Sequence, residues 1–291
     1  MELAGDAASE LAWHGRGVPR FMDLSLSRRL ERTEGSVGAS FTAPRQRLAP
    51  QLGATWREFD GTYAIFDGAD SPLTQTFGLG LFGAATPAQL AQIEAFFHDR
   101  GAPVMHEVSP LAGVETLALL VDRGYQPIEL STVLVQDIAP VAEAAASPAL
   151  RVRMIDPGDL ADRAAWLETS VAGWSADPAV ALIIRSVAEL VSANDSMAHF
   201  VVERDGAPVA TGSLGIDGGV ALLAGASTMP AARGHGAQAL LLTARLAEAH
   251  RRGCEIAMMV TSPGSTSQHN AERRGFCVAY TRSKWRLACA T

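Results

Sequence analysis

The sequence predicts an α/β protein in which a mixed, mostly antiparallel sheet is flanked by helices. Three observations support this prediction. Segments with strand-like apolar patterning alternate with segments of helical spacing, as they do in α/β folds. Asp217-Gly218-Gly219 separates two strand-like segments and is a strong hairpin signal. The two halves of the 291-residue chain also repeat a similar order of elements, which favours two domains.

The boundary between the halves is expected at Asp137–Pro148. This segment contains two prolines and several alanines, and it lacks the alternation of a strand. We therefore expect one domain at residues 1–138 and a second at residues 149–291.

The second half gives the clearer series of elements. Arg252-Gly253 follows the longest predicted helix and matches the basic last turn and glycine typical of a helix end. Arg204-Asp205-Gly206 is a turn signal between two strands. The expected strands are Leu150–Ile155, His199–Glu203, Val209–Ile216, Val220–Thr228, Glu255–Thr261 and a final strand pair that ends at Leu287, and the expected helices are Leu160–Ala172, Val180–Val191, Ala237–Arg252 and Ser267–Arg274.

The first half repeats part of this order less clearly. Thr86-Pro87 begins a helix that ends near Arg100, with threonine as the N-cap and proline at the first helical position. Strands are expected at Thr76–Phe82, Val104–Val108 and Ile128–Val135.

Both halves close with the same two landmarks, a Ser-Pro dipeptide and a later Arg-Gly-aromatic tripeptide. The proline-to-glycine spacing is 14 residues from Pro110 to Gly124 and 12 residues from Pro263 to Gly275. Two landmarks in the same order indicate an internal duplication. Chance similarity between two α/β halves is the alternative.

The segment Thr228–Leu242 carries the most chemical information, because Arg233-Gly234-His235-Gly236 lies between a strand and a helix. The first turn of a helix has unpaired N–H groups and a partial positive charge, and glycine lets a ligand approach the backbone. This loop therefore suits a phosphate or pyrophosphate. The alternative is an ordinary strand-to-helix connection that uses glycine for its geometry. The loop is neither a P-loop, which needs Gly-Lys-Ser/Thr, nor a G-x-G-x-x-G motif, because Ala239 replaces the third glycine.

This order of strand, proline, Arg-Gly-x-Gly and helix resembles motif A of the GCN5-related N-acetyltransferases, the GNAT family. The downstream segment Ser267–Phe276 resembles the segment that closes such domains. The resemblance covers Leu150–Leu287 well and the first half only as a weak, degenerate copy. It implies a tandem protein of two GNAT-like domains, in which only the second domain carries the CoA loop.

The resemblance also implies which residues bind acetyl-CoA, the co-substrate. Arg233 would open the loop, and Asn270 would hydrogen-bond the pantetheine arm. Ala226, Ser227 and Thr228 at the strand end would pair with the same arm, where this strand and its neighbour splay apart. The backbone N–H groups that would hold the pyrophosphate are those of Gly234, His235, Gly236, Ala237, Gln238 and Ala239.

Departures from the family pattern leave the catalytic residues unassigned. Gln238 is larger than the usual glycine or alanine, although Arg-Gly-x-Gly-Ala-Gln resembles a variant within the family. Ala271 stands where the family usually has the tyrosine that protonates the departing thiolate. No general base is evident, because Glu203 and Asp217 are the nearest carboxylates and both are expected to be solvated charges at turns.

Composition limits the partners that we expect. The net charge of −7, without a long basic run, argues against nucleic acid. No apolar stretch reaches the ~20 residues of a membrane span, and no secretory apolar region is present near Met1, so we expect a cytoplasmic protein that does not bind membranes. The three cysteines and seven histidines show no metal-ligand spacing, so we expect no metal.

The first half lacks an equivalent loop, because Gly83–Pro87 contains no Arg-Gly-x-Gly and its proline removes an N–H donor. We expect this half to bind no CoA and to form one wall of the acceptor cleft, since domain interfaces often hold small-molecule sites. Two fused domains can replace a dimer within one chain, so a monomer is favoured over a homodimer.

The function expected is transfer of an acetyl group from acetyl-CoA to an amine of a small molecule or peptide. A catalytically weak pseudoenzyme or sensor that binds acyl-CoA is the alternative, and it is favoured by Ala271 and by the missing base. A nucleotide-binding α/β regulator is a third reading, but it leaves the Asn270–Phe276 pattern unexplained.

Overall fold

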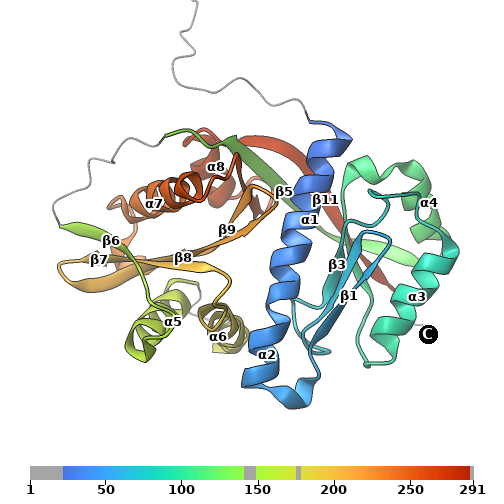
Figure 1. The fold of residues 1–291 in the computed structure, drawn as a ribbon, viewed down its shortest axis with the longest axis horizontal. Coiled ribbons are helices and arrows are strands. Elements are labelled where there is room, and N and C mark those ends of the chain that lie inside the picture. The colour runs from blue at the N-terminus through green and yellow to red at the C-terminus, as the bar shows by residue number, and fades with distance from the viewer. Residues whose placement is uncertain (1–21, 141–148, 175–177, 289–291) are drawn as a thin grey trace, which may run out of the picture.

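The fold is a single 11-stranded sheet with helices on both faces (Figure 1). The computed structural model describes residues 22–140, 149–174 and 178–288. The strands lie in the order β1-β2-β3-β4-β11-β5-β10-β9-β8-β7-β6. Of the strand pairs described, β3–β4 and β9–β10 are parallel and the others are antiparallel. The prediction of an α/β protein with a mixed, mostly antiparallel sheet is confirmed.

Both halves contribute strands and helices. The strands are β1 (Thr55–Phe59), β2 (Thr62–Phe66), β3 (Gln75–Phe77), β4 (Met105–Val108), β5 (Tyr125–Asp137), β6 (Leu150–Met154), β7 (Ala198–Arg204), β8 (Ala207–Asp217), β9 (Val220–Thr228), β10 (Ile256–Thr261) and β11 (Cys277–Leu287). The α-helices are α1 (Leu24–Ser40), α2 (Thr42–Leu48), α3 (Pro87–His98), α4 (Val114–Asp122), α5 (Leu160–Trp174), α6 (Pro178–Ser192), α7 (Ala237–Arg251) and α8 (Thr266–Glu272). Short 3-10 turns lie at Pro50–Leu52, Pro110–Ala112 and Pro230–Ala232.

Alternation along the strands places different helices on the two faces of the sheet. In β9, Leu222 packs with Leu30 of α1, whereas the next residue, Leu223, packs with Leu241 of α7. In β7, Val201 packs with Trp166 of α5. One face of the sheet in the second half is therefore covered by α1 and α5, and the opposite face by α7.

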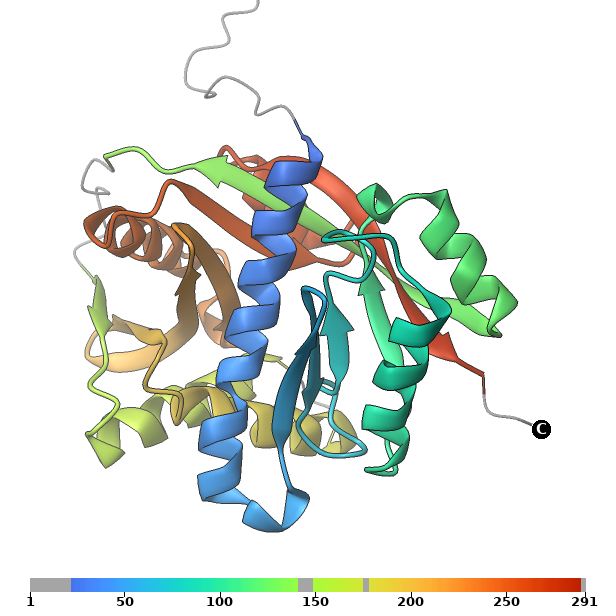
Figure 2. The ribbon, with the colours of Figure 1, turned by 45° about the vertical axis from the view of Figure 1, so that its right-hand side comes forward.

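The closing strands of the two halves are exchanged. β5, which closes the first half, pairs with β10 of the second half. β11, which closes the second half, pairs with β4 of the first half, and β5 and β11 pair with each other between them. Figure 2 shows α1 crossing the junction in front of strands from both halves. The two halves thus share one continuous sheet, and their division at residues 138 and 149 remains a prediction.

Most predicted elements of the second half lie within a few residues of their observed bounds. The hairpin turn is confirmed, because Gly218 and Gly219 take φ values of 51° and 75°, as a two-residue turn of this type requires. The predicted final strand pair is wrong: β11 is one strand whose whole length pairs with β5. In the first half, the strand predicted at Thr76–Phe82 ends at Phe77, because Gly78 turns the chain with a φ of 87°. Residues 141–148 of the predicted linker lie outside the described residues.

The sequence patterns did not predict α1, α2, α4, β1 or β2. The reason is clear for α1, whose buried side includes Ser27, Glu31, Thr33 and Gly35 in addition to apolar residues. A helix that contacts both halves of a sheet and buries polar groups has no simple apolar stripe for periodicity to detect.

A buried cluster of charges joins α1 to the exchanged strand β11. The guanidinium of Arg282, whose side chain is 2% exposed, contacts the carboxylates of Glu31 at 3.1 Å, Glu34 at 2.7 Å and Glu107 at 3.0 Å. The hydroxyl of Tyr280 donates to Glu31 at 2.7 Å. Burial raises the pKa of Glu31 to about 7, against the opposing effect of Arg282.

Glu31→Gln is expected to flatten the pH dependence of stability. Because the pKa of Glu31 is higher in the folded protein than in the unfolded chain, its contribution is full below about pH 4.5 and is lost as the pH rises through about 7. Glutamine has no proton to lose, so the wild type should lose stability relative to the variant between pH 5 and pH 8. Thermal midpoints of both proteins across this range test the expectation. A difference that does not change with pH would contradict it.

Candidate active site

The predicted loop connects β9 to α7 through one 3-10 turn, Pro230–Ala232. Gly236 precedes α7 with a φ of 86°, and no side chain caps the first turn of this helix. No acidic residue lies in that turn either. A Cβ atom at Gly234 would meet nothing within 4 Å, and Gly234 and His235 are exposed. The loop therefore presents uncapped N–H groups and an open approach, as an anion site requires.

The Arg233 side chain is directed toward the protein. Its Nε donates to the carbonyl of Thr228 at 3.2 Å, and one terminal nitrogen donates to the carbonyl of Gly173 at 3.0 Å. Gly173 lies in the last turn of α5, where carbonyl groups lack helical partners. Arg233 thus ties the loop to the end of β9 and to the opposite helix layer. The groups of the loop that remain free to meet an anion are backbone N–H groups.

The residues at the end of β9 are held by side-chain contacts. Gln238 donates to the hydroxyl of Thr228 at 2.6 Å, so its larger side chain lies against the strand end. The Ser227 hydroxyl donates to the carbonyl of Ser170 at 3.3 Å and lies 3.1 Å from the hydroxyl of Thr211. Ala226 packs against the core beneath α7. The side chains of Ala226, Ser227 and Thr228 are therefore held by protein contacts.

The strands β9 and β10 diverge beyond a short paired segment. Their pairing is limited to Val220–Leu222 of β9 and residues 256–258 of β10, although both strands continue further. The divergence leaves residues Ala224–Thr228 without a strand partner on the β10 side. This is the splay that the resemblance implied.

A β-bulge lies within the splayed part of β9. The pairing between β8 and β9 passes from Ser213 opposite Ala224 to Thr211 opposite Ser227, so Gly225 and Ala226 have no opposite residue. Gly225 takes a φ of 61°. Bulges re-aim the backbone at functional sites.

The second predicted segment brings Asn270 to an exposed position on α8. Its neighbour Ala271 is 3% exposed and packs in the apolar core beneath α7, together with Phe276. The position that carries a tyrosine in the family pattern is therefore closed by core packing, and it presents no acid to solvent.

Neither nearby carboxylate is a free solvated charge, so that expectation is corrected. Glu203 is half-buried and forms an ion pair with Arg153 at 2.7 Å. Asp217 accepts a hydrogen bond from the hydroxyl of Ser36 at 3.0 Å. Both carboxylates contact neighbouring elements of the fold, and neither lies in the splayed segment.

Two buried polar residues near the bulge were missed by sequence analysis. His199 donates from Nε2 to the carbonyl of Asn194 at 3.1 Å, which leaves Nδ1 to accept from the Ser213 hydroxyl at 2.8 Å. Burial lowers the pKa of His199, so the ring is neutral. Arg245 of α7 lies on the other side of the sheet, beneath the same bulge. The only sequence signal for Arg245 is a charge within the apolar repeat of its helix.

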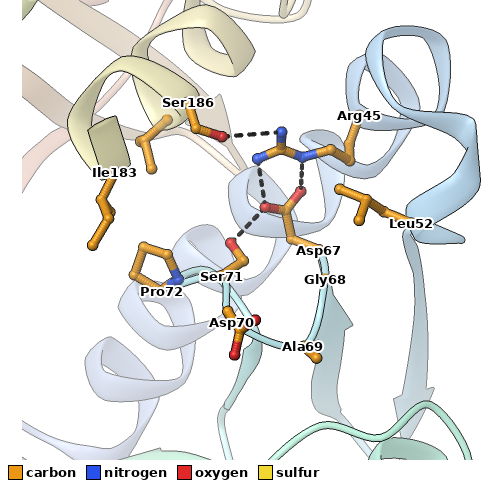
Figure 3. A pocket seen from close by; sticks show the side chains of 11 residues that line it. Arg45, Leu52, Asp67, Gly68, Ala69, Asp70, Ser71, Pro72, Ile183 and Ser186 are labelled. Carbon is orange, nitrogen blue, oxygen red and sulfur yellow. Dashed lines mark hydrogen bonds and ion pairs between the residues drawn. The ribbon is translucent and has the colours of Figure 1, made fainter. Parts of the chain in front are cut away.

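A cavity of about 310 Å³ lies between the halves, next to α2, α6 and the loop after β2 (Figure 3). None of the predicted site residues lines it. Much of its polar wall is internally paired: Arg45 contacts Asp67 at 2.8 Å and Ser186 at 3.4 Å, and Ser71 donates to Asp67 at 2.6 Å. These polar groups connect the two halves and are not left open to a ligand.

The described residues contain no group of three or more His, Cys, Asp or Glu side chains arranged to hold a metal ion. Across the same ranges, no helix combines the length and apolar character needed to cross a membrane. Cys254 is buried and Cys277 is exposed, and both are free thiols.

Comparison with known proteins identifies the domain. The family model of the acetyltransferase (GNAT) family matches residues 164–276. A GCN5-related N-acetyltransferase from Kribbella flavida has a similar fold, with a TM-score of 0.65 at 14% identity over 91% of this chain and 96% of that chain. A tandem GNAT protein from the clavulanic acid biosynthesis pathway has a TM-score of 0.59 at 13% identity over 92% of this chain and 96% of that chain.

A GCN5-related N-acetyltransferase from Sphaerobacter thermophilus is also similar, with a TM-score of 0.52 at 17% identity over 73% of this chain and 71% of that chain. The curated proteins contain no match. At these identities the structural likeness shows the fold, and the family model shows the family of the matched segment. Residues 164–276 therefore form an acyltransferase domain of the GNAT family, in a chain with the fold of tandem GNAT proteins.

Proposed function

We propose that this protein transfers an acetyl group from acetyl-CoA to an amine of a small molecule or peptide. The observation that carries the proposal is the uncapped, glycine-lined start of α7 beside the splayed strands β9 and β10. Acyl transfer by a GNAT domain needs an anion site for the CoA diphosphate and a strand edge for its pantetheine arm. The start of α7 and the unpaired edge of β9 provide these two features, and they are adjacent in the chain.

The residues present fit acetyl-CoA. In the proposal, the N–H groups of residues 234–239 hold the pyrophosphate, since the helix start is open and uncapped. The free edge of β9 at Ala226–Thr228 pairs with the pantetheine arm, and Asn270 hydrogen-bonds it from α8. Arg233 keeps the loop in place through the carbonyls of Thr228 and Gly173.

When bound, acetyl-CoA supplies an acyl carbon that an amine attacks directly. A C–N bond forms, the C–S bond breaks with its electron pair on sulfur, the amine proton passes to water, and water protonates the thiolate. The bulge of β9 aims backbone N–H groups at the thioester carbonyl, which stabilises negative charge as it develops there. Water takes both proton-transfer roles because Ala271 is buried and both nearby carboxylates are already bound.

The first half is proposed to bind no CoA and to form a wall of the acceptor cleft. The contrast with α7 supports this. Helix α3 begins with Pro87, which has no N–H, and the Thr86 side chain accepts from the backbone of Gln89 at 3.1 Å. The start of α3 therefore offers fewer free donors to a diphosphate. We also propose that the protein is a monomer, because the exchange of β5 and β11 joins both halves within one chain.

A pseudoenzyme or sensor that binds acyl-CoA is the second candidate function. The buried Ala271 favours it, because the usual source of the proton for the thiolate is absent from that position. Both functions require the same CoA site, so turnover separates them.

Titration calorimetry with acetyl-CoA, followed by a thiol-release screen over amines, polyamines, amino acids and peptides, tests the proposal. Binding with thiol release that depends on an amine supports the transferase. Binding without turnover on any acceptor class supports the pseudoenzyme. Absence of binding would overturn both.

Asn270→Ala is expected to weaken acetyl-CoA binding about fivefold to tenfold, the effect of losing roughly one net hydrogen bond of about 1 kcal/mol. The exposed neighbour His269 provides the matched control, His269→Ala, which should leave affinity unchanged. Calorimetry of both variants measures the difference. Equal affinities for Asn270→Ala and the wild type would remove Asn270 from the site.

A further inference from the structure

Arg245 is a buried cation beneath the β9 bulge. Arg245 is 3% exposed and lies on α7, which covers the face of the sheet opposite α1 and α5. Among the described residues, no carboxylate forms an ion pair with it, and burial lowers its pKa to about 10. The guanidinium therefore stays charged at neutral pH while it is surrounded by protein. A buried charge without a counter-ion is costly, so the groups that bind Arg245 in place of a carboxylate bear on its role.

The guanidinium of Arg245 binds three backbone carbonyls. Its Nε donates to Leu241 at 3.4 Å, and Nη1 lies 3.4 Å from the carbonyl oxygens of both Ser213 and Ala224. Ser213 and Ala224 are the last paired residues before the register of β8 and β9 shifts. Arg245 thus satisfies the carbonyls on both strands at the point where the bulge begins.

The neighbouring glycine makes room for this arrangement. A Cβ atom at Gly212 would lie 3.2 Å from Nη1 of Arg245 and 3.0 Å from Cδ2 of Leu241. Gly212 is the β8 residue that the register shift skips. A side chain at Gly212 would therefore crowd the Arg245 guanidinium, so the glycine at the bulge leaves the space that the arginine fills.

The Ala224 carbonyl and the Gly225 N–H belong to the same peptide group. A charged donor on the carbonyl oxygen polarises that group and makes its N–H a stronger donor, because hydrogen bonds in a chain reinforce one another at low dielectric. Gly225 lies in the bulge, on the splayed part of β9 that has no strand partner toward β10. This N–H group has no strand partner toward β10, so it is available to the thioester carbonyl in the proposed reaction.

We propose that Arg245 is a positioning residue for acyl transfer, which holds the β9 bulge in shape and polarises the Ala224–Gly225 peptide toward the reacting carbonyl. This inference rests on the proposed function. It assigns a role in the chemical step to a residue that touches neither acetyl-CoA nor the amine. The pyrophosphate loop is separate from this contact, so Arg245 should affect turnover more than binding of CoA.

The test compares Arg245→Met with Arg245→Lys. Methionine keeps much of the side-chain volume and removes the donors, so kcat should fall about tenfold to a hundredfold, up to the loss seen when one oxyanion donor is removed. The dissociation constant of CoA, measured by calorimetry, should change less than about threefold. Lysine retains a cation and should recover part of kcat.

Leu246→Ala is the matched control, because Leu246 is buried on the same helix and packs in the same core. It should lower the thermal midpoint while kcat at 25 °C stays near the wild-type value. Should Arg245→Met keep its kcat, or lose kcat only in proportion to a loss of CoA binding, the inference is overturned.

The NMR resonance of the Gly225 amide group distinguishes failure of the inference from failure of the proposed function. If wild type binds CoA without turnover, acetyl-CoA should still shift this resonance relative to CoA, and Arg245→Met should abolish the shift. A resonance that responds equally in both proteins overturns the inference alone. Wild-type protein that binds no CoA overturns the proposed function, and the inference with it.

Discussion

Gly236→Asp is expected to weaken acetyl-CoA binding by at least about a hundredfold while the fold is retained. The substitution places a carboxylate at the start of α7, where the proposal puts the diphosphate. At an effective dielectric of about 20, like charges a few ångströms apart repel by several kcal/mol, and a hundredfold corresponds to about 2.7 kcal/mol. Calorimetry measures the affinity, and circular dichroism reports the fold.

Gly236→Asn is the matched control, since asparagine has the same shape without the charge. Gly236 takes a φ of 86°, a conformation that aspartate and asparagine tolerate better than most residues. A Cβ atom there would meet Leu150 at an ordinary contact distance of 3.9 Å. The asparagine variant should therefore lose much less affinity than the aspartate variant. Equal losses would trace the effect to backbone shape, and an unchanged affinity in both would place the diphosphate elsewhere.

Arg282→Met is expected to destabilise the protein by about 3–5 kcal/mol. The substitution leaves Glu31 buried without its cation, whereas Glu107 keeps its contact with Lys284 at 3.2 Å, and removal of one member of a buried ion cluster costs roughly this much. The cluster also fastens the exchanged strand β11 to α1, so the loss falls on the junction of the two halves. Urea unfolding of variant and wild type measures the difference.

Two further variants test whether the loss of stability comes from the burial of the charges or only from the removal of one positive charge. Arg251→Met removes an exposed arginine paired with Glu248 and should leave the unfolding midpoint nearly unchanged. Above pH 7, adding Glu31→Gln to Arg282→Met should restore part of the lost stability, because the single variant must there either bury an uncompensated Glu31 carboxylate or take up a proton. An Arg282 variant as stable as the wild type would show that the cluster contributes nothing net.

The sequence predicted the candidate loop because every signal there is local. A strand, a Pro-x-x-Arg-Gly-x-Gly turn and a helix follow one another within a short segment, and φ values above zero at Gly234 and Gly236 agree with the glycine requirement. The same holds for the hairpin at Gly218 and Gly219. Turn chemistry is set by a few neighbouring residues, so it can be read without knowledge of the fold.

The side chains around the loop could not be predicted in the same way. Arg233 was expected to open the loop, and the structure adds that it binds the carbonyl of Gly173, 60 residues away in the chain. Glu203 was expected to be solvated, but it pairs with Arg153 on the adjacent strand. The sequence did not single out Arg245, because its partners are backbone carbonyls. Their position beside Arg245 depends on the bulge in β9.

The amino-acid sequence by itself determined the local conformations: which segments are strands and helices in the second half, where they turn, and where a glycine loop precedes a helix. The tertiary structure decided which strand edges meet. Alternation gives β5 and β11 a buried face but does not name their partners, since any strand with a matching face and register can pair. Their exchange, the charge cluster around Arg282 and the burial of Arg245 all follow from contacts between distant segments, which no local pattern encodes.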